Sequence, residues 1–402
     1  MKATSTVRPR SVRTVLVVCA ALTVAASTTQ AFAAPSPAAG RGVTWTSSMV
    51  TPSDASILGT TRLDAHTTWA SGMRLVRESG RWHFAPTVWE RDERKGTGWK
   101  QLATAPAAEA ADIRFNDIDA SSPRSALVVG DQPERVSGIV TQSWDGDAWT
   151  SALAPVPAGS VGGGFLSVDA RTARDAWAAG WFQVPVSAND TRHVGQLQHW
   201  DGTRWTQADL PDVGEGPTGG WTLASVAVRD RDDVWAVGGT FSSAGAKPVL
   251  LHFDGVRWTK ATAPDLGDVR ARLNGVAAGP DGAVWAVGET VGADRVSRGL
   301  VLRYDGTTWS RVPLPEGTGP LQSVAVSGAA PVVLVRENEG AAPAVLRRTG
   351  GTWTSLGMPT GGGGVTDVWD ISAYGRTVDV TAWLPRGAND LVGAGMVLTA
   401  RR

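Results

Sequence analysis

The carboxylates that could do acid–base or cation chemistry lie in a column of short, similar strands. Each strand carries one small or acidic residue before a Val or Ile: Asp117, Ser167, Ser225, Gly275, Ser323 and Asp367. Two carboxylates that face one narrow channel cost free energy unless they are hydrated or paired. Asp117 and Asp367 are therefore predicted to meet a cation, a ligand hydroxyl or channel water. In unequal environments the same pair would suit hydrolytic or lyase chemistry on a glycan.

Other residue types that commonly carry chemistry are scarce or badly spaced. The five histidines form no pair with metal-ligand spacing, so the sequence supports no metal site and no cofactor. The one cysteine, Cys19, lies in the N-terminal segment, which leaves the rest of the chain without thiols or disulfides. Tyr374 is the one candidate nucleophile for sialidase-like chemistry, because the other tyrosine, Tyr304, belongs to a repeat.

Loops offer further candidates for recognition, because binding residues tend to lie on loops held by a rigid scaffold. One loop, 180–195, carries Trp181, Asn189, Asp190, Arg192 and His193, and another, 289–299, carries Asp294, Arg295 and Arg298. Six tryptophans outside the repeated positions are predicted stacking residues: Trp82, Trp89, Trp181, Trp221, Trp369 and Trp383. Ordinary solvated connectors are the alternative interpretation of these loops.

A repeated hairpin must position all of these residues. Its clearest copies are 144–149, 200–205, 253–258 and 304–309, each an aromatic residue, Asp-Gly, two further residues and a Trp. Asp-Gly between apolar runs is a strong hairpin signal, because the turn needs residues that tolerate positive φ. With weaker copies at Trp45, Trp99 and Trp353, the marker Trp recurs every 44 to 56 residues, a period typical of propeller blades.

Each repeat holds a second hairpin upstream, such as 223–228 followed by 232–238, and four short strands make one propeller blade. The last repeat has three strands and no Trp-bearing fourth, whereas Gly42 to Thr46 supplies a lone fourth strand. Joining them predicts an all-β, seven-bladed propeller over 42–402, in which ring closure removes the exposed sheet edge. The two repeated Trp columns are predicted to pack between neighbouring blades.

The repeat resembles those of kelch and galactose-oxidase-like propellers. An apolar strand ends at Gly238-Gly239, Phe253-Asp254 follows, and Trp258 comes next. Most copies have one glycine where kelch has two, and their Asp and Trp are closer together. The turn is also similar to the Asp-box of sialidase-type propellers. The resemblance implies a fold and no activity, and galactose oxidase copper chemistry is excluded because it needs a Cys–Tyr crosslink.

The N-terminal segment is predicted to be a secretory signal peptide. A positively charged stretch precedes an apolar core at 15–26, and Ala31-Phe32-Ala33 is a small-x-small cleavage site. Residues 1–33 would be removed and 34–41 would form a short linker. The mature chain would then be secreted, with no transmembrane segment. Lipid attachment at Cys19 is the alternative, although Val18 stands where a small residue is expected.

The charge balance narrows the partner class. Acidic and basic residues number 38 each, so the chain lacks the excess of positive charge that nucleic-acid binding requires. The sequence predicts a secreted, monomeric, non-catalytic propeller that binds an extracellular polysaccharide or protein through its loop face. Two alternatives stay open. One is an extracellular hydrolase or lyase acting on glycans through Asp117 and Asp367, and the other is a purely structural wall-associated protein.

Overall fold

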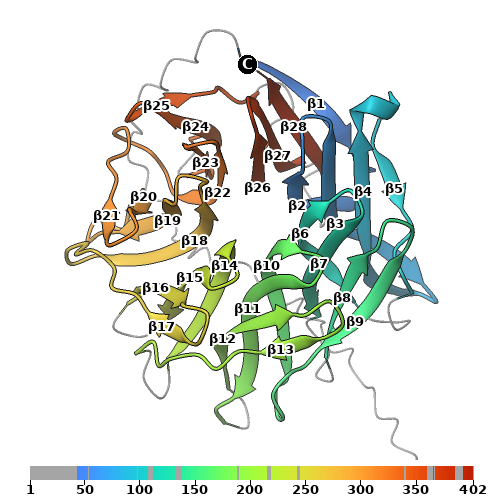
Figure 1. The fold of residues 1–402 in the computed structure, drawn as a ribbon, viewed down its shortest axis with the longest axis horizontal. Helices are drawn as coiled ribbons and strands as arrows, with labels where there is room; N and C mark the ends of the chain where they lie inside the picture. Colours follow the sequence, from blue (N-terminus) through green and yellow to red (C-terminus); the bar gives the residue numbers. More distant parts are fainter. Residues whose placement is uncertain are drawn as a thin grey trace, which may run out of the picture. The chain divides into compact units, whose positions relative to one another are not determined.

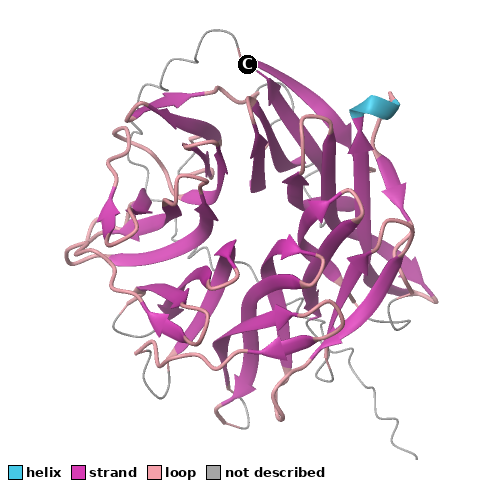
Figure 2. Cartoon of the chain, in the orientation of Figure 1, coloured by secondary structure: helices cyan, strands magenta, loops and turns pink. Residues whose placement is uncertain are grey.

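The computed structural model describes residues 43–401 except 53, 97, 107–111, 133–137, 188–189, 215–218, 242–244, 339–340, 360–364, 366 and 385–392. The predicted signal peptide and linker lie outside the described residues. All described residues belong to one compact unit, Ser36–Arg402. In the described part, the regular elements are strands apart from one 3-10 turn, η1 (Glu93–Lys95) (Figure 2).

Three sheets have four antiparallel strands each, and two sheets of eight strands each divide into two further units of four. Every unit is named by its first strand (Figure 1). The β2 unit contains β2 (Ala55–Arg62), β3 (Thr67–Glu78), β4 (Arg81–Asp92) and β5 (Lys100–Leu102). The β6 unit contains β6 (Arg114–Ser122), β7 (Ser125–Gln132), β8 (Ile139–Trp144) and β9 (Trp149–Ala154). The β10 unit contains β10 (Gly162–Thr172), β11 (Asp175–Pro185), β12 (Thr191–Trp200) and β13 (Trp205–Gln207).

The later units follow the same order along the chain. The β14 unit contains β14 (Gly220–Asp230), β15 (Asp233–Phe241), β16 (Pro248–Phe253) and β17 (Trp258–Lys260). The β18 unit contains β18 (Arg270–Ala278), β19 (Val284–Val291), β20 (Ser297–Tyr304) and β21 (Trp309–Arg311). The β22 unit contains β22 (Leu321–Ser327), β23 (Ala330–Val335), β24 (Ala344–Thr349) and β25 (Thr352–Ser355). The β26 unit contains β26 (Asp367–Tyr374), β27 (Thr377–Leu384), β28 (Ala394–Arg401) and, from the N-terminal end, β1 (Thr44–Val50).

The Asp-Gly turns that the sequence predicts join the third and fourth strands of four units. In the first of them, Asp145 Oδ1 accepts hydrogen bonds from the backbone N–H groups of Asp147 and Ala148, both at 2.9 Å. Gly146 has a φ of 104°, in the left-handed region where only glycine is unstrained. The turns at Asp201, Asp254 and Asp305 repeat the same pair of backbone contacts.

The first strands neighbour one another in a closed order: β2, β6, β10, β14, β18, β22, β26 and again β2. Figure 1 shows these strands around a common centre, with the later strands of each unit further out. β1 pairs antiparallel with β28, from Thr44 opposite Arg401 to Val50 opposite Met396, which is the pairing predicted for the N-terminal strand. No described helix is long and apolar enough to cross a membrane.

Tryptophans fill several of the seams between neighbouring units, as the repeat predicts. Trp235 of β15 makes an edge contact with Trp309 of the next unit at a centroid distance of 5.1 Å. Trp177 of β11 packs in the same way on Trp258, also at 5.1 Å. Their equivalent in the β2 unit, Trp69, is fully buried and lies 5.9 Å from Trp149. The large aromatic area buried at these seams holds the adjacent sheets together.

Candidate functional site

Every first strand contains a β-bulge, which changes the register of the side chains that follow it. In β6 the register with β7 shifts between Phe115 and Asp117, and the other first strands shift at the same point. A bulge adds an unpaired residue and re-aims the side chains that follow it. In β26 the shift is longer, because it runs from Val368 to Ile371.

The longer bulge corrects one sequence prediction. Asp370, immediately before Ile371, occupies the position that Asp117 holds before Ile118. Asp367 lies before the bulge, opposite Trp383, at the position of Arg114 in β6. The prediction that Asp367 belongs to the channel column is therefore wrong, and Asp370 takes its place. Burial raises the pKa of Asp367, Arg336 counteracts this effect, and Glu337 reinforces it.

Four half-buried carboxylates lie on first strands around the common centre, and we call Asp117, Asp119, Asp169 and Asp370 the channel cluster. Each accepts a hydrogen bond from a backbone N–H of the next first strand around the ring. Asp117 Oδ2 accepts from Val168 at 2.8 Å, and Asp370 Oδ2 accepts from Thr60 at 2.9 Å. Asp119, two residues after Asp117, accepts from Ala170 at 2.8 Å, and Asp169, two residues after Ser167, accepts from Val228 at 2.9 Å.

Serine hydroxyls make the same link where a carboxylate is missing. Ser167 Oγ accepts from the N–H of Val226 at 3.3 Å, and Ser225 Oγ accepts from the N–H of Val276 at 3.2 Å. The small polar column seen in the sequence thus joins one first strand to the next. Such side-chain acceptors satisfy backbone donors that would otherwise be lost at the crowded centre of the ring.

The electrostatics of the channel cluster favour protonation. Burial raises the pKa of Asp117, and the neighbouring Asp370 raises it further. Burial and the charge of Asp119 raise the pKa of Asp169, and burial also raises the pKa values of Asp119 and Asp370. A like charge in a poorly solvated place disfavours ionisation. Within the described ranges, no three His, Cys, Asp or Glu residues are placed to hold a metal ion.

The hydrogen bonds limit what these acids can do chemically. Asp117 Oδ1 accepts from the N–H of Ile118 at 2.8 Å, so both of its oxygens have a backbone donor. Asp119 Oδ1 accepts from the Thr61 hydroxyl and Asp370 Oδ1 from the Ser323 hydroxyl, each at 2.8 Å. A general acid or base must be free to approach a substrate proton. Both oxygens of these three acids are instead engaged with backbone or hydroxyl groups of the protein itself.

The loop 180–195 does not present its aromatic residue to solvent. Trp181 is 2% exposed and packs on His193 at a centroid distance of 4.6 Å. Burial lowers the pKa of His193, so this ring favours the neutral form. Trp221 is 4% exposed and lies against Gly195, where an added Cβ would come within 2.2 Å of the indole. The prediction that Trp181 and Trp221 are exposed stacking residues is wrong.

The remaining predicted loop residues make mostly local contacts. Asp190 Oδ1 accepts from its neighbour Thr191, Arg192 donates to the carbonyl of Gly219, and Asn189 lies outside the described residues. Asp294 pairs with Arg298, which is the main cause that lowers the pKa of Asp294 to about 2. Arg295 has a φ of 63° in the turn between them. The structure brings these residues together within each loop and not into one site.

Of the tryptophans predicted to be exposed, Trp82 is 61% exposed and Trp369 39% exposed. Trp82 follows the tip of the β3–β4 hairpin, with the Arg77 guanidinium 5.8 Å from its ring centroid. β3 and β4 are twelve residues long, whereas the equivalent β15 and β16 have nine and six. The hairpin contacts the segment that leads into the next unit, since the Phe84 N–H donates to Asp112 at 2.8 Å.

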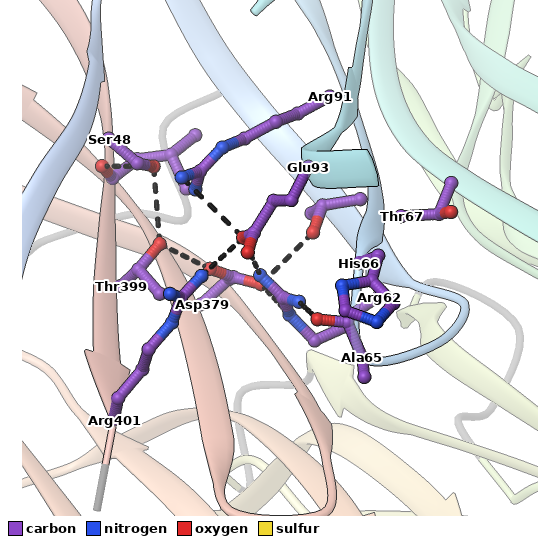
Figure 3. A network of polar contacts seen from close by, with 12 residues as sticks. Ser48, Arg62, Ala65, His66, Thr67, Arg91, Glu93, Asp379, Thr399 and Arg401 are labelled. Carbon is purple, nitrogen blue, oxygen red and sulfur yellow. Dashed lines mark hydrogen bonds and ion pairs between the residues drawn. The ribbon is translucent and has the colours of Figure 1, made fainter. Parts of the chain in front are cut away.

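Sequence reasoning missed a polar network where β26 and β2 units meet (Figure 3). Arg62 and Asp379, whose side chains are both fully buried, form an ion pair. The Thr399 hydroxyl donates to Asp379 at 2.6 Å, and Glu93 pairs with both Arg91 and Arg401. Asp379 lies opposite Ser372, as Trp235 lies opposite Ala227, so an acid stands where other units have the seam Trp. The aligned repeat could have revealed that exchange.

Three solved structures similar to the described fold place it in a known class. The first is YCF48 bound to D1 peptide, with 16% identity over 91% of this chain and 99% of that chain and a TM-score of 0.53. The BP39L lectin from Burkholderia pseudomallei has 12% identity, coverage of 87% and 96%, and a TM-score of 0.54. The WD40 β-propeller domain of Doa1 has 9% identity, coverage of 89% and 97%, and a TM-score of 0.50.

These similarities establish the fold class. The chain is a β-propeller, built of four-stranded antiparallel units around a centre. It matches no protein-family model and no curated protein sequence. The kelch and galactose-oxidase-like resemblance therefore stays a prediction, and the low identities say nothing about activity.

Proposed function

We propose that this protein is a secreted propeller of seven four-stranded blades, without a catalytic site, that binds an extracellular polysaccharide or protein through its loop face. The blade count is supported by the closed order of first strands and by the β1–β28 pairing. Secretion is supported by the N-terminal sequence pattern. Similar folds occur in a lectin and in a peptide complex, so both partner classes are compatible with the fold.

The observation that carries the proposal is the projecting β3–β4 hairpin, which holds Trp82 exposed beside Arg77. Connections between second and third strands form the loop face, and this hairpin is one of them. Tryptophan and arginine dominate the binding energy of recognition surfaces, and a braced hairpin presents them at little entropic cost. The bracing comes from Phe84, whose carbonyl accepts from Ile113 and whose ring lies under the Arg114 guanidinium.

The engaged oxygens of the channel cluster weaken the enzymatic alternative. An acid–base pair needs one protonated and one ionised carboxyl, both open to substrate. Asp117, Asp119 and Asp370 each use both oxygens within the protein. We therefore assign the channel acids to holding the ring and recognition to its surface.

Thermal unfolding with a panel of neutral and acidic polysaccharides tests the proposal, with Trp82→Ala as the variant. A ligand present at about a hundred times its Kd adds roughly 2.7 kcal/mol, which raises the midpoint by a few degrees. We expect Trp82→Ala to abolish the shift. Val256→Ala, which alters a side chain 86% exposed in a third-to-fourth-strand turn, should preserve it.

A protein partner would give no shift with any polysaccharide. A photo-crosslinking residue at position 82 on the secreting cells should then capture one discrete partner, whereas the same residue at position 256 should not. Turnover of any glycan that disappears in Asp117→Asn would overturn the non-catalytic assignment and favour the hydrolase or lyase.

A further inference from the structure

Two neighbouring units carry an Asp–Trp–His arrangement that the sequence repeat had not revealed. In the β10 unit, His199 packs on Trp177 at a centroid distance of 4.9 Å, and its Nε2 lies 2.8 Å from Asp175 Oδ1. In the β14 unit, His252 stacks on Trp235 at 4.3 Å, with its Nε2 3.1 Å from Asp233. Asp233 also accepts a hydrogen bond from the Trp235 indole at 3.0 Å.

The β18 unit has the same tryptophan, but different residues stand in place of the aspartate and the histidine. Trp285 pairs with Arg303 in the register in which Trp235 pairs with His252. Ala283, two residues before Trp285, is buried where Asp233 stands in the preceding unit. The unit has therefore lost a carboxylate and gained a guanidinium. The Trp285 Nε1–H is buried and has no hydrogen-bond partner.

A second guanidinium lies on the same indole from the next unit. The Cζ atoms of Arg303 and Arg348 are each 5.6 Å from the Trp285 ring centroid. Arg311 lines the same pocket, which has a volume of about 400 Å³ and also includes Ser310 and Asp281. Three arginines face one aspartate, so the pocket has an excess of positive charge.

No carboxylate of the described chain lies within ion-pair distance of Arg303, Arg311 or Arg348. Asp281 accepts from the Ala283 N–H at 3.3 Å, and the nearby Asp305 is engaged with the backbone of its own turn. The Arg348 Nε is buried without a hydrogen-bond partner. Cations gathered in one place repel one another unless an anion offsets them, most strongly where they are partly buried, as Arg303 and Arg348 are.

We propose that this pocket binds an oxyanion, as a sulfate, phosphate or carboxylate group. The ligand would stand in for the carboxylate that Asp175 and Asp233 supply in the two preceding units. Its oxygens would accept from the guanidinium groups, whose planar donors match such anions in a bidentate manner. Ser310 also lines the pocket, where its hydroxyl donates to the Arg303 carbonyl at 3.4 Å.

The next unit repeats the exchange and so supports the assignment. Ala330 and Arg347 occupy the positions of Asp233 and His252, since Val332 pairs with Arg347. Together with Arg376 they line a second pocket of about 400 Å³. Asp281 and Ala329 line the first pocket and lie in turns between first and second strands. The pocket is therefore at the opposite strand ends from the Trp82 hairpin, which joins a second strand to a third.

Indole NMR on the whole protein labelled with 15N-tryptophan tests the proposal. Sodium sulfate, sodium phosphate and sodium glucuronate would be titrated at constant ionic strength against sodium chloride, with dextran sulfate and neutral dextran as polymer arms. We expect a saturable shift of the Trp285 indole signal, assigned by its loss in Trp285→Phe. A response to the free ions identifies a small oxyanion as sufficient, whereas a response to dextran sulfate alone assigns a polymer-borne group.

The deciding variant is Ala283→Asp with Arg303→His, which installs the arrangement of the β14 unit and should fold. Losing one charge-assisted interaction should weaken oxyanion binding roughly tenfold or more. Arg311→Gln, at an exposed position, should also weaken binding, and Arg257→His, which does not line the pocket, should not. The proposal is overturned if no oxyanion shifts the signal beyond chloride, or if the double variant binds as tightly as the native protein.

Discussion

The side chain of Asp169 stabilises the fold through a hydrogen bond between strands, but its ionisation is disfavoured by burial and by a neighbouring acid. Its carboxylate links β10 to Val228 of β14, while burial and Asp119 raise its pKa from 3.8 to about 8. A folded-state pKa above the unfolded value means that the native protein binds the extra proton. The stability contributed by this group is therefore present below pH 4 and declines as the pH rises towards 8.

Asp169→Asn should remove that decline while keeping an oxygen that can accept from Val228. We expect the variant to be more stable than the native protein at pH 8, by on the order of 1–2 kcal/mol, and to lose this advantage near pH 4. Urea unfolding at both pH values measures the difference. Asp147→Asn, at an exposed acid, is the matched control. An equal loss of stability at both pH values would contradict the argument.

The tryptophans show how far single residues could be interpreted from sequence. The repeat predicts that Trp235 and Trp177 pack between units, because residues that recur at one strand position occupy equivalent places in the fold. Both tryptophans do pack there. Trp181 and Trp221 lie outside those columns and are buried at places specific to their unit. Trp221 fits only because Gly195 has no side chain. That space depends on a neighbouring strand, which a local sequence pattern does not contain.

Among elements, five of the bulged first strands have a glycine opposite the residue before the bulge, whereas β22 has Val335 there and β26 has Ala382. A Cβ added to Gly238 of β15 would lie 1.9 Å from the carbonyl oxygen of Thr222 in β14, and Gly130 shows the same clash with Arg114 at 1.7 Å. Both sides of the contact are backbone, so one strand must move. Gly238→Ala should therefore lower the free energy of unfolding by about 1–3 kcal/mol.

Chemical denaturation of Gly238→Ala beside Gly98→Ala checks this expectation. Gly98 has open space around its Cα, so the control substitution should be neutral or slightly stabilising. A Gly238→Ala protein as stable as the control would show that the bulge is not rigid.

The hairpins were predictable and the bulge was not, for a physical reason. An Asp-Gly turn is determined by residues within six positions of one another, as Asp145 and its two backbone donors show. A bulge is defined against the partner strand, and its length in β26 differs from the others. Counting back from Val368 therefore selected Asp367, three residues before the acid that joins the channel.

At the scale of the whole molecule, the ring must close between its first and last units, and this seam differs chemically from the others. Where Trp235 and Trp177 bury aromatic area, Asp379 of β27 forms a buried ion pair with Arg62 of β2 (Figure 3). The two residues are 317 positions apart in sequence. Each charge would be costly to bury against an apolar surface, so the pair favours closure of β26 onto β2 over association of either unit with an apolar surface elsewhere.

Two variants test this interpretation, one that leaves a single buried charge and one that removes both charges of the pair. Asp379→Leu alone leaves the buried Arg62 with only its longer 3.9 Å contact to Glu93 as a charged partner, and should cost about 3 kcal/mol of unfolding free energy. Arg62→Leu with Asp379→Leu removes both charges and should recover most of that loss, while giving more dimers or larger species by light scattering. If the double variant is as unstable as the two single losses added together, packing and not charge pairing holds the seam. If it is stable and strictly monomeric, the pair does not direct closure, and the β1–β28 pairing alone suffices to join the ends of the ring.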